Sequence, residues 1–365
     1  MPDFNFITSQ FQFEGVFIGA APYGQGHIHD TYTAHFHNPD SSIKRYILQQ
    51  MNTYVFMNPE AVMGNIEVVT RHLRQKIQQS GGNPERETVT LVPAINGSSF
   101  FHSESGEYWR AEVFIEGAQS YQNGKSLDHY CQAARAFGRF QKMLGDLEAN
   151  LISTTIPDFH NTPKRISAFI TAVEQDVRNR AHTVQTEIDF ILHREADTGI
   201  LVNLWEQGVL PERVIHNDTK LDNVMIDDVT GEGVCVIDLD TVMPGLSLFD
   251  FGDAIRSGAN PAAEDEIVLN KVQFDLRIFE RYVKGYLDEV RNFLTPSEID
   301  YLAFSARVIT LEQAIRFLTD YLNGDVYYKI DRENHNLDRC RTQLKLVADM
   351  ERLSGEMDEL VGRYR

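Results

Sequence analysis

The stretch over residues 215–240, IHNDTKLDNVMIDDVTGEGVCVIDLD, constrains the fold more than any other part of the chain. It contains Asp218, then Asn223 five residues later, and Asp238 fifteen residues beyond Asn223. Two apolar runs, VMI and VCVI, are separated by a turn sequence that contains two glycines. This order predicts a tight loop followed by a β-hairpin. Because a hairpin brings its entrance and its exit together, Asn223 and Asp238 are expected to lie side by side.

Three polar groups at this spacing are typical of the catalytic loops of kinases. In those loops an Asp accepts the proton of the acceptor hydroxyl, and an Asn and a later Asp hold Mg²⁺ against the ATP phosphates. The pattern therefore predicts Asp218 as the base and Asn223 and Asp238 as ligands, because Mg²⁺ prefers oxygen donors. Lys220 would reach the γ-phosphate and offset its charge. The alternative is a solvated hairpin with incidental acidic residues, which the complete HNDTKLDN and ID pattern disfavours.

Charge and composition limit the partners of the chain. Its 365 residues are enough for two lobes with a substantial core. Thirty-four Lys and Arg against fifty-three Asp and Glu give a net charge of −19, which repels nucleic acid and anionic membranes. No apolar run approaches the ~18 residues of a membrane helix, and the N-terminus lacks the features of a signal peptide. We therefore expect a cytoplasmic protein that binds neither nucleic acid nor membrane, with its three scattered cysteines reduced.

A glycine turn falls between the first two expected strands. Backbone amides of Gly24 and Gly26 could lie over phosphates, because glycine allows close approach. A plain hairpin turn is the simpler interpretation of an isolated G-x-G. His27 and His29 follow, and on a strand they would point the same way. Hydrogen bonding is a commoner role for such histidines than metal binding, and direct contact with a polar substrate stays open.

A helix is expected over residues 58–79, where apolar residues recur at three- and four-residue steps. Its middle carries Glu67. Kinases use a Glu on such a helix to hold a strand lysine, but glutamine occupies positions 49 and 50 here. Either a glutamine amide contacts the phosphates, with Gln50 as the candidate, or the helix is merely packed.

The β composition ends at Glu116, which predicts a lobe boundary there. Further strands are expected at 89–95 and 108–115, and almost everything after Glu116 except the hairpin has helical periodicity. We expect an α+β, bilobal, protein-kinase-like fold with a small β-sheet N-lobe carrying one helix and a larger, mostly helical C-lobe. The N-terminal nucleotide-binding lobe would span residues 1–116 and the C-terminal catalytic lobe residues 117–365. In such a chain Glu116 offers backbone groups to adenine, with Phe114 and Ile115 beside the ring.

Two patterns in the C-terminal half have competing interpretations. Residues 250–252 spell the kinase triplet DFG, but the spacing from Asn223 favours Asp238 as the metal ligand. Asp250 and Asp253 are expected to brace the catalytic loop through backbone amides or to cap a helix. Further on, Arg316 lies between Glu312 and Asp320 at i, i+4 and i+8, which by pattern alone predicts a surface salt-bridge ladder.

Several segments together resemble the aminoglycoside phosphotransferase superfamily of small-molecule kinases, and within it the N-acetylhexosamine 1-kinases. The similar segments are YGQGHIHDTY, RYILQQMN, HNDTKLDN, IDLDTVMPG, LFDFGDAIR and RFLTDYLNGDVY, and the likeness covers nearly the whole chain. It implies the bilobal kinase-like fold, ATP and Mg²⁺ as cofactors, and transfer of phosphate to the anomeric hydroxyl of GlcNAc or GalNAc.

The resemblance also implies roles for particular residues. It makes Asp218 the base, Asn223 and Asp238 the metal ligands, and Lys220 a substrate or phosphate contact. It also implies a sugar-binding role for the residues at three further positions, which are His27, Arg316 and Tyr327. This replaces the surface interpretation of Arg316. His29 departs from the Asn that the family has at this position.

Two other functions compete with this one. An aminoglycoside kinase needs an acidic pocket for a polycation, and the net charge of −19 is compatible with that. A nucleotide-binding pseudokinase is disfavoured because all three catalytic positions are filled.

Overall fold

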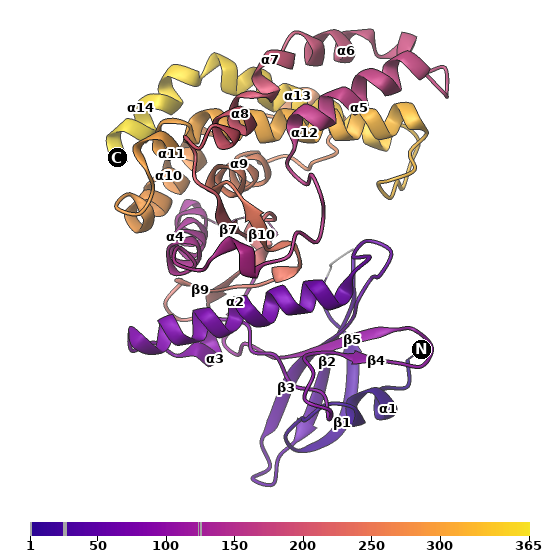
Figure 1. Cartoon of the computed structure of the whole chain (residues 1–365), viewed down its shortest axis with the longest axis vertical. Helices are drawn as coiled ribbons and strands as arrows, with labels where there is room; N and C mark the ends of the chain where they lie inside the picture. Colours follow the sequence, from indigo (N-terminus) through magenta and orange to yellow (C-terminus); the bar gives the residue numbers. More distant parts are fainter. Residues whose placement is uncertain (1, 25–27, 123, 125) are drawn as a thin grey trace.

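The N-terminal lobe is built on a five-stranded antiparallel sheet with the order β1-β2-β3-β5-β4 (Figure 1). The computed structural model describes residues 2–24, 28–122, 124 and 126–365. The strands are β1 (Val16–Pro22), β2 (Asp30–His37), β3 (Ile43–Gln50), β4 (Phe101–His102) and β5 (Tyr108–Val113). One face of the sheet, with the short helix α1 (Phe4–Ser9), carries its own hydrophobic core, which includes Leu48 and Trp109.

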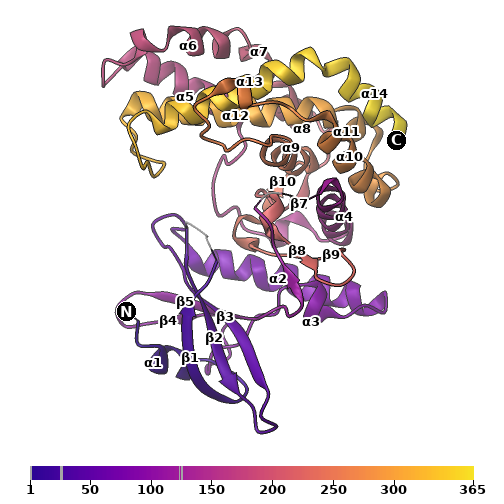
Figure 2. The ribbon, with the colours of Figure 1, turned by 180° about the vertical axis from the view of Figure 1, so that it is seen from behind.

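The expected helix is α2 (Pro59–Gln79), which crosses between the sheet and the C-terminal lobe (Figures 1 and 2). Asn58 caps its start by accepting a hydrogen bond from the Ala61 N–H at 3.1 Å. The apolar stripe is buried as predicted and joins the large hydrophobic cluster of the C-terminal lobe. A one-turn helix, α3 (Pro84–Glu87), follows. Because α2 packs against both lobes, the boundary at residues 116 and 117 stays a prediction.

The C-terminal lobe is mostly helical, and the α+β fold class is confirmed. Its helices are α4 (Leu127–Met143), α5 (Thr162–Gln175), α6 (Gln185–Leu192), α7 (Glu195–Thr198), α8 (Ile200–Glu206), α9 (Ser247–Gly258), α10 (Leu276–Val290), α11 (Pro296–Asp300), α12 (Leu302–Asn323), α13 (His335–Arg352) and α14 (Ser354–Tyr364). The central helix α12 is buried along most of its length between α5, α9 and α13.

The predicted hairpin is present as β8 (Val224–Asp227) and β9 (Gly233–Val236), with Val224 opposite Val236. A short strand, β6 (Ala118–Gln119), adds to β8 directly after the connection between the lobes. A second pair, β7 (Arg213–Ile215) with β10 (Met243–Gly245), frames the catalytic-loop segment on its other side. These two small sheets position the residues on which the site depends.

Some predicted elements differ from the structure. Residues 89–95 form isolated bridges, Leu91 to Glu112 and Ala94 to Phe11, in place of a strand. Pro93 interrupts this segment, and proline has no N–H to give to a ladder. The helical periodicity expected after Glu116 is interrupted in places: residues 185–206 are divided among the three short helices α6, α7 and α8, and Leu353 separates α13 from α14.

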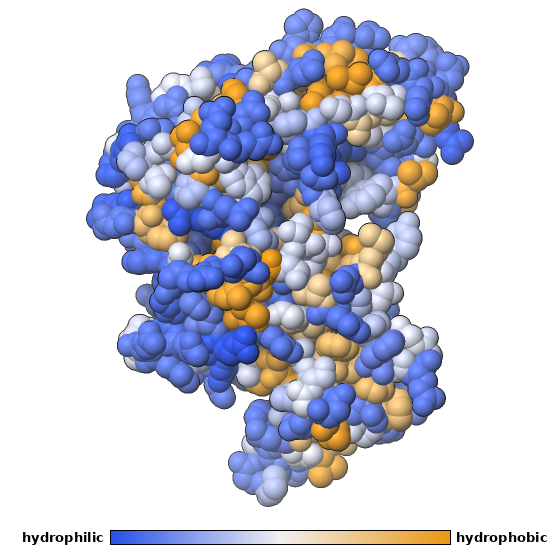
Figure 3. All heavy atoms as spheres, viewed as in Figure 1, coloured by the Kyte–Doolittle hydropathy of each residue, from blue (hydrophilic) through white to orange (hydrophobic). Residues whose placement is uncertain are grey.

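In the described part of the chain, no helix combines the length and apolar character that crossing a membrane requires. The face in Figure 3 is largely hydrophilic, with apolar side chains in scattered groups, and it narrows between the two lobes.

Candidate active site

Asp218, Lys220 and Asn223 meet in the connection between β7 and β8. Asp218 Oδ2 lies 3.2 Å from Lys220 Nζ. Asn223 Nδ2 donates to the backbone oxygen of Asp218 at 2.8 Å and to its Oδ2 at 2.9 Å. A 3₁₀ turn over Leu221–Asn223 brings the chain back for this contact. The Asp218 side chain is still partly open to solvent, so an acceptor hydroxyl has access to it.

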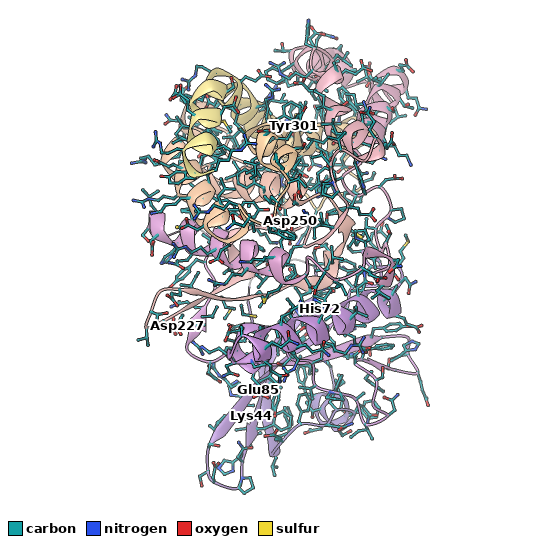
Figure 4. All side chains as sticks on the ribbon, turned by 60° about the vertical axis from the view of Figure 1, so that its left-hand side comes forward. Lys44, His72, Glu85, Asp227, Asp250 and Tyr301 are labelled. Carbon is teal, nitrogen blue, oxygen red and sulfur yellow. The ribbon has the colours of Figure 1, made fainter. Side chains whose placement is uncertain are left out.

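Asp250, near the start of α9, holds this loop from inside the lobe (Figure 4). Its Oδ2 accepts the His216 N–H at 2.9 Å, and its Oδ1 accepts the Asn217 N–H at 2.7 Å. Asp253 Oδ2 likewise accepts the Thr219 N–H at 3.0 Å. The prediction that these two acids brace the loop through backbone amides is therefore confirmed. The bonds also fix Asn217 at φ 67°, a left-handed conformation that persists only where the surroundings impose it.

Asp238 follows directly on the hairpin. The Ile237 N–H donates to the backbone oxygen of Asn223 at 2.9 Å, so Asp238 directly follows a residue that is hydrogen-bonded to Asn223. Its backbone has φ 61° and ψ 59°. Solvent can reach its side chain, but many protein atoms lie around the carboxylate and reduce its hydration. This loss of hydration, together with the Asp240 and Asp218 carboxylates, raises the pKa of Asp238 well above its ordinary value, against the opposing charge of Lys220.

The oxygens at this point fit a divalent cation. Asn223 Nδ2 is committed to Asp218, while its Oδ1 has no donor among the described residues. Within the described part of the chain Asp238 forms no ion pair either, and the Asp240 and Asp218 carboxylates add negative charge near it. Within the described ranges, no group of three His, Cys, Asp or Glu could hold a metal ion. The Asn and Asp would therefore need phosphate or water oxygens to complete the coordination of Mg²⁺.

The connection after β5 offers free backbone groups to a nucleotide base. In the described part of the chain, the Ile115 N–H and C=O and the Glu116 N–H have no hydrogen-bond partner. Phe114 is buried beneath the Arg45 guanidinium, which lies 3.9 Å from the ring centroid. Arg86 donates to the Glu116 carbonyl and so fixes this connection. Such free amide and carbonyl groups beside apolar side chains are what adenine recognition requires.

The structure describes only some of the residues that the sequence suggests as phosphate contacts. Gly24 has φ 78°, a backbone conformation that glycine adopts without strain, whereas Gly26 and His27 lie outside the described residues. Gln50 is on the face of β3 that carries the buried core, and its amide donates to Glu107. Gln49 is on the opposite face, so the structure places Gln49, and not Gln50, toward the other lobe. The reason is the two-residue alternation of a strand.

Arg316 and Tyr327 line one cavity of about 200 Å³ beside α12. The Arg316 guanidinium lies 5.6 Å from the ring centroid of Phe159 and donates to Gln313 Oε1 at 3.2 Å. Tyr327 lies in the segment that follows α12. In Figures 1 and 2 this segment extends toward the N-terminal lobe, on the side where α2 begins. Tyr327 is 69% exposed at this position.

The surface ladder on α12 is wrong because its acids are buried and paired elsewhere. Glu312 accepts hydrogen bonds from His160 at 2.8 Å and from the Thr162 hydroxyl at 2.6 Å. Asp320 accepts the backbone N–H groups of the turn that presents Tyr327, at 2.8 Å for Tyr327 itself. Asp320 thus forms part of the cavity wall, and among the described residues no carboxylate forms an ion pair with the Arg316 side chain, although the charge of Glu312 still acts on it.

The ion pair between Arg110 and Asp240 was not predicted from the sequence. Arg110 on β5 donates from Nη1 and Nη2 to the two Asp240 oxygens, both at 2.6 Å. The pair links the N-terminal sheet to the segment that carries Asp238. Charged residues at alternate positions of an otherwise apolar strand, Arg110 and Glu112, were the available signal.

Comparisons with known proteins agree with this geometry. Residues 86–286 match the phosphotransferase enzyme family. An aminoglycoside phosphotransferase from Alicyclobacillus acidocaldarius subsp. acidocaldarius DSM 446 superposes with a TM-score of 0.65 at 12% identity, over 100% of this chain and 97% of that chain. A spectinomycin phosphotransferase in complex with ADP and spectinomycin gives 0.57 at 14% identity, over 93% and 95%. A microcompartment-associated aminopropanol kinase gives 0.55 at 15% identity, over 93% of each chain. At these identities the likeness shows the fold.

The family match extends over more than half of the residues. The chain belongs to the phosphotransferase enzyme family and has the kinase-like fold of aminoglycoside phosphotransferases.

Proposed function

We propose that the protein is an ATP- and Mg²⁺-dependent kinase that phosphorylates the anomeric hydroxyl of GlcNAc or GalNAc. The observation that carries the kinase assignment is the meeting of Asp218, Lys220, Asn223 and Asp238 on one loop and one hairpin. The sugar assignment rests on the resemblance and on the cavity that Arg316 and Tyr327 share.

Asp218 would orient the acceptor hydroxyl and take its proton. An anomeric hydroxyl is more acidic than an ordinary alcohol, so one carboxylate base is sufficient. The Asn223 amide orients Asp218 through its 2.9 Å hydrogen bond, and Lys220 supplies positive charge beside the base. Phosphoryl transfer depends mainly on positioning and charge stabilisation. Held by Asn223 and Asp238, Mg²⁺ would neutralise the charge of the transferring phosphoryl group.

The nucleotide would enter between the lobes. The free Ile115 and Glu116 backbone groups would bind adenine, with Phe114 and Ile115 as apolar contacts. Gly24 and Gly26 would lie over the phosphates. Of the two strand glutamines, Gln49 is the better candidate for a phosphate contact because it shares a face with the ion pair between the lobes.

The charge of the acceptor cavity favours a neutral sugar over a polycationic antibiotic. The cavity is lined by two arginines, Arg165 and Arg316. Its one carboxylate, Asp320, is occupied by backbone N–H groups and by Asn336. A polycation would face positive charge here, whereas a pyranose offers hydroxyl and amide oxygens that accept hydrogen bonds from Arg316 and Tyr327. His27, which lies outside the described residues, is the third proposed sugar contact.

Acceptor-dependent ADP release tests this function. Steady-state release would be measured with GlcNAc, GalNAc, kanamycin and no acceptor, with the Asp218→Asn variant as the control for contaminating activity. We expect release with the hexosamines only. Release with kanamycin alone would indicate an antibiotic kinase, and nucleotide binding without any acceptor-dependent release would indicate a pseudokinase.

A further inference from the structure

Among the residues that the structure describes, no ion pair joins β3 to α2, in contrast to the corresponding strand and helix of protein kinases. In those enzymes a lysine of the third strand pairs with a glutamate of the helix that follows it. Here Gln49 occupies the corresponding face of β3, where its amide donates to the Thr31 hydroxyl at 3.0 Å. Glu67, in the middle of α2, is exposed and forms no ion pair within the described chain.

A cation on the neighbouring strand takes a different partner. Arg110 stands opposite Gln49 in the sheet, and its Nε donates to Gln49 Oε1 at 2.8 Å. Its two terminal nitrogens each donate to one oxygen of Asp240 at 2.6 Å. Both residues are 2% exposed. The guanidinium is therefore committed to the other lobe and is not free to bind a phosphate.

Asp240 is two residues from Asp238, within the 3₁₀ turn Leu239–Thr241. His29 approaches the same carboxylate, with its Nε2 at 3.4 Å from Asp240 Oδ1. The other ring nitrogen, Nδ1, accepts the Asn52 N–H at 2.9 Å, which leaves the proton on Nε2. Asp240 thus contacts both Arg110 of β5 and His29, which follows the glycine turn, and it lies in the turn that directly follows the proposed metal ligand Asp238. His29 belongs to this cluster through the hydrogen bond at Nδ1 and the approach of Nε2 to the Asp240 carboxylate.

A second contact between the lobes supports the same segment. Asn65 of α2 donates from Nδ2 to the Val242 carbonyl at 3.1 Å and to the Ser153 carbonyl at 2.8 Å. Asp238 itself has a left-handed backbone, which persists only where its surroundings impose it. The neighbouring Asp240 carboxylate repels it, and the Arg110 guanidinium offsets part of that charge.

We propose that Arg110 is a positioning residue for magnesium binding. Through its bidentate contact with Asp240 it fixes the turn that directly follows Asp238 and so holds Asp238 in place, and it makes metal binding depend on the contact between the lobes. This rests on the proposed function only in that Asp238 is taken as a metal ligand. A lysine would keep the charge and lose the two-pronged contact, so the geometry of the guanidinium is the essential feature.

Nucleotide binding to the purified full chain tests this role without any sugar. The dissociation constant of a non-hydrolysable ATP analogue would be measured by calorimetry with Mg²⁺ and with EDTA, for the wild type, Arg110→Lys and Asp240→Asn. The matched control is Arg213→Lys, because Arg213 also makes a bidentate contact with a buried carboxylate, Glu298, at 2.7 and 2.8 Å, but within the C-terminal lobe. Melting temperatures would be recorded for every variant.

We expect Arg110→Lys and Asp240→Asn to reduce the gain in affinity that Mg²⁺ provides by about tenfold or more, with the metal-free affinity unchanged within about twofold. Arg213→Lys should lower the melting temperature and keep the full gain. If Arg110→Lys keeps the wild-type gain and differs only in melting temperature, the contact is merely structural and the proposal fails. Failure of the sugar assignment would appear separately, as absent ADP release with hexosamines despite normal magnesium-dependent nucleotide binding.

Discussion

Replacing Asp250 and Asp238 one at a time separates a structural acid from a metal ligand. The Asp250 carboxylate accepts three hydrogen bonds, from the His216 N–H, the Asn217 N–H and the Gln141 amide, all within 2.9 Å. Asp250→Ala leaves these three donors without their acceptor. Each buried donor left without a partner costs about 1–3 kcal/mol. Water or a small shift of the loop would satisfy some of these donors. We therefore expect the free energy of unfolding to fall by about 3–5 kcal/mol, a large share of the ~5–15 kcal/mol typical of a folded protein.

Asp238→Ala should behave in the opposite way. The structure gives its carboxylate no hydrogen-bond donor among the described residues, and the nearby acids repel it. Its removal should leave the free energy of unfolding within about 1 kcal/mol of the wild-type value. Magnesium-dependent nucleotide binding should nevertheless be lost, because one of the two protein ligands is gone.

Urea unfolding at 25 °C and calorimetry with Mg²⁺ and an ATP analogue provide the two measurements. Asp250→Asn, which keeps one acceptor oxygen, serves as a milder variant if Asp250→Ala does not fold. If a folded Asp250 variant loses magnesium-dependent binding while Asp238→Ala keeps it, Asp238 is not the metal ligand. That result would identify Asp250, the first residue of the DFG triplet, as the metal ligand.

Three further predictions concern other parts of the chain. Asp218→Asn should lower kcat by roughly 10²–10⁴-fold with nucleotide affinity retained, and turnover within a few-fold of wild type would exclude it as the base. Arg316→Ala should raise the sugar KM by roughly 10- to 150-fold, as expected for losing a charged hydrogen bond of ~1.5–3 kcal/mol, whereas an unchanged sugar KM would remove it from the acceptor site. Burial raises the pKa of Glu298, but hydrogen bonds from Arg213, Ser247 and the Thr295 N–H outweigh it and hold that pKa below its ordinary value. The stability gap between the wild type and Glu298→Gln should therefore be constant above pH ~4.3 and narrow on further acidification; a gap that widens in acid would contradict the assignment.

The sequence predicted the elements whose periodicity is set locally. The apolar stripe of α2 and the hairpin of β8 and β9 were both visible in the order of residues. Breaks within helical stretches were not, because they depend on packing between helices that are distant in sequence. The segment over 89–95 failed for a related reason, since its bridges run to residues 11 and 112.

Within the candidate site, the sequence could identify residues that lie close together along the chain. It could not identify residues that are distant along the chain and that folding brings into contact. Asp218, Asn223 and Asp238 lie on one loop and one hairpin, so their spacing was informative. Arg110 and Asp240 are 130 residues apart, and nothing in either segment indicates the other. The helix pattern around Arg316 predicted a surface ladder because spacing along α12 does not reveal that both of its acids are buried.

The position of the phosphate on the sugar is the most direct test of the proposed function. The product formed from ATP, Mg²⁺ and GlcNAc would be examined by phosphorus NMR, with Asp218→Asn as the control. We predict a hexosamine 1-phosphate, identified by coupling of its phosphorus to the anomeric proton. A phosphate on another hydroxyl, or no phosphorylated sugar at high enzyme concentration, would contradict an anomeric hexosamine kinase.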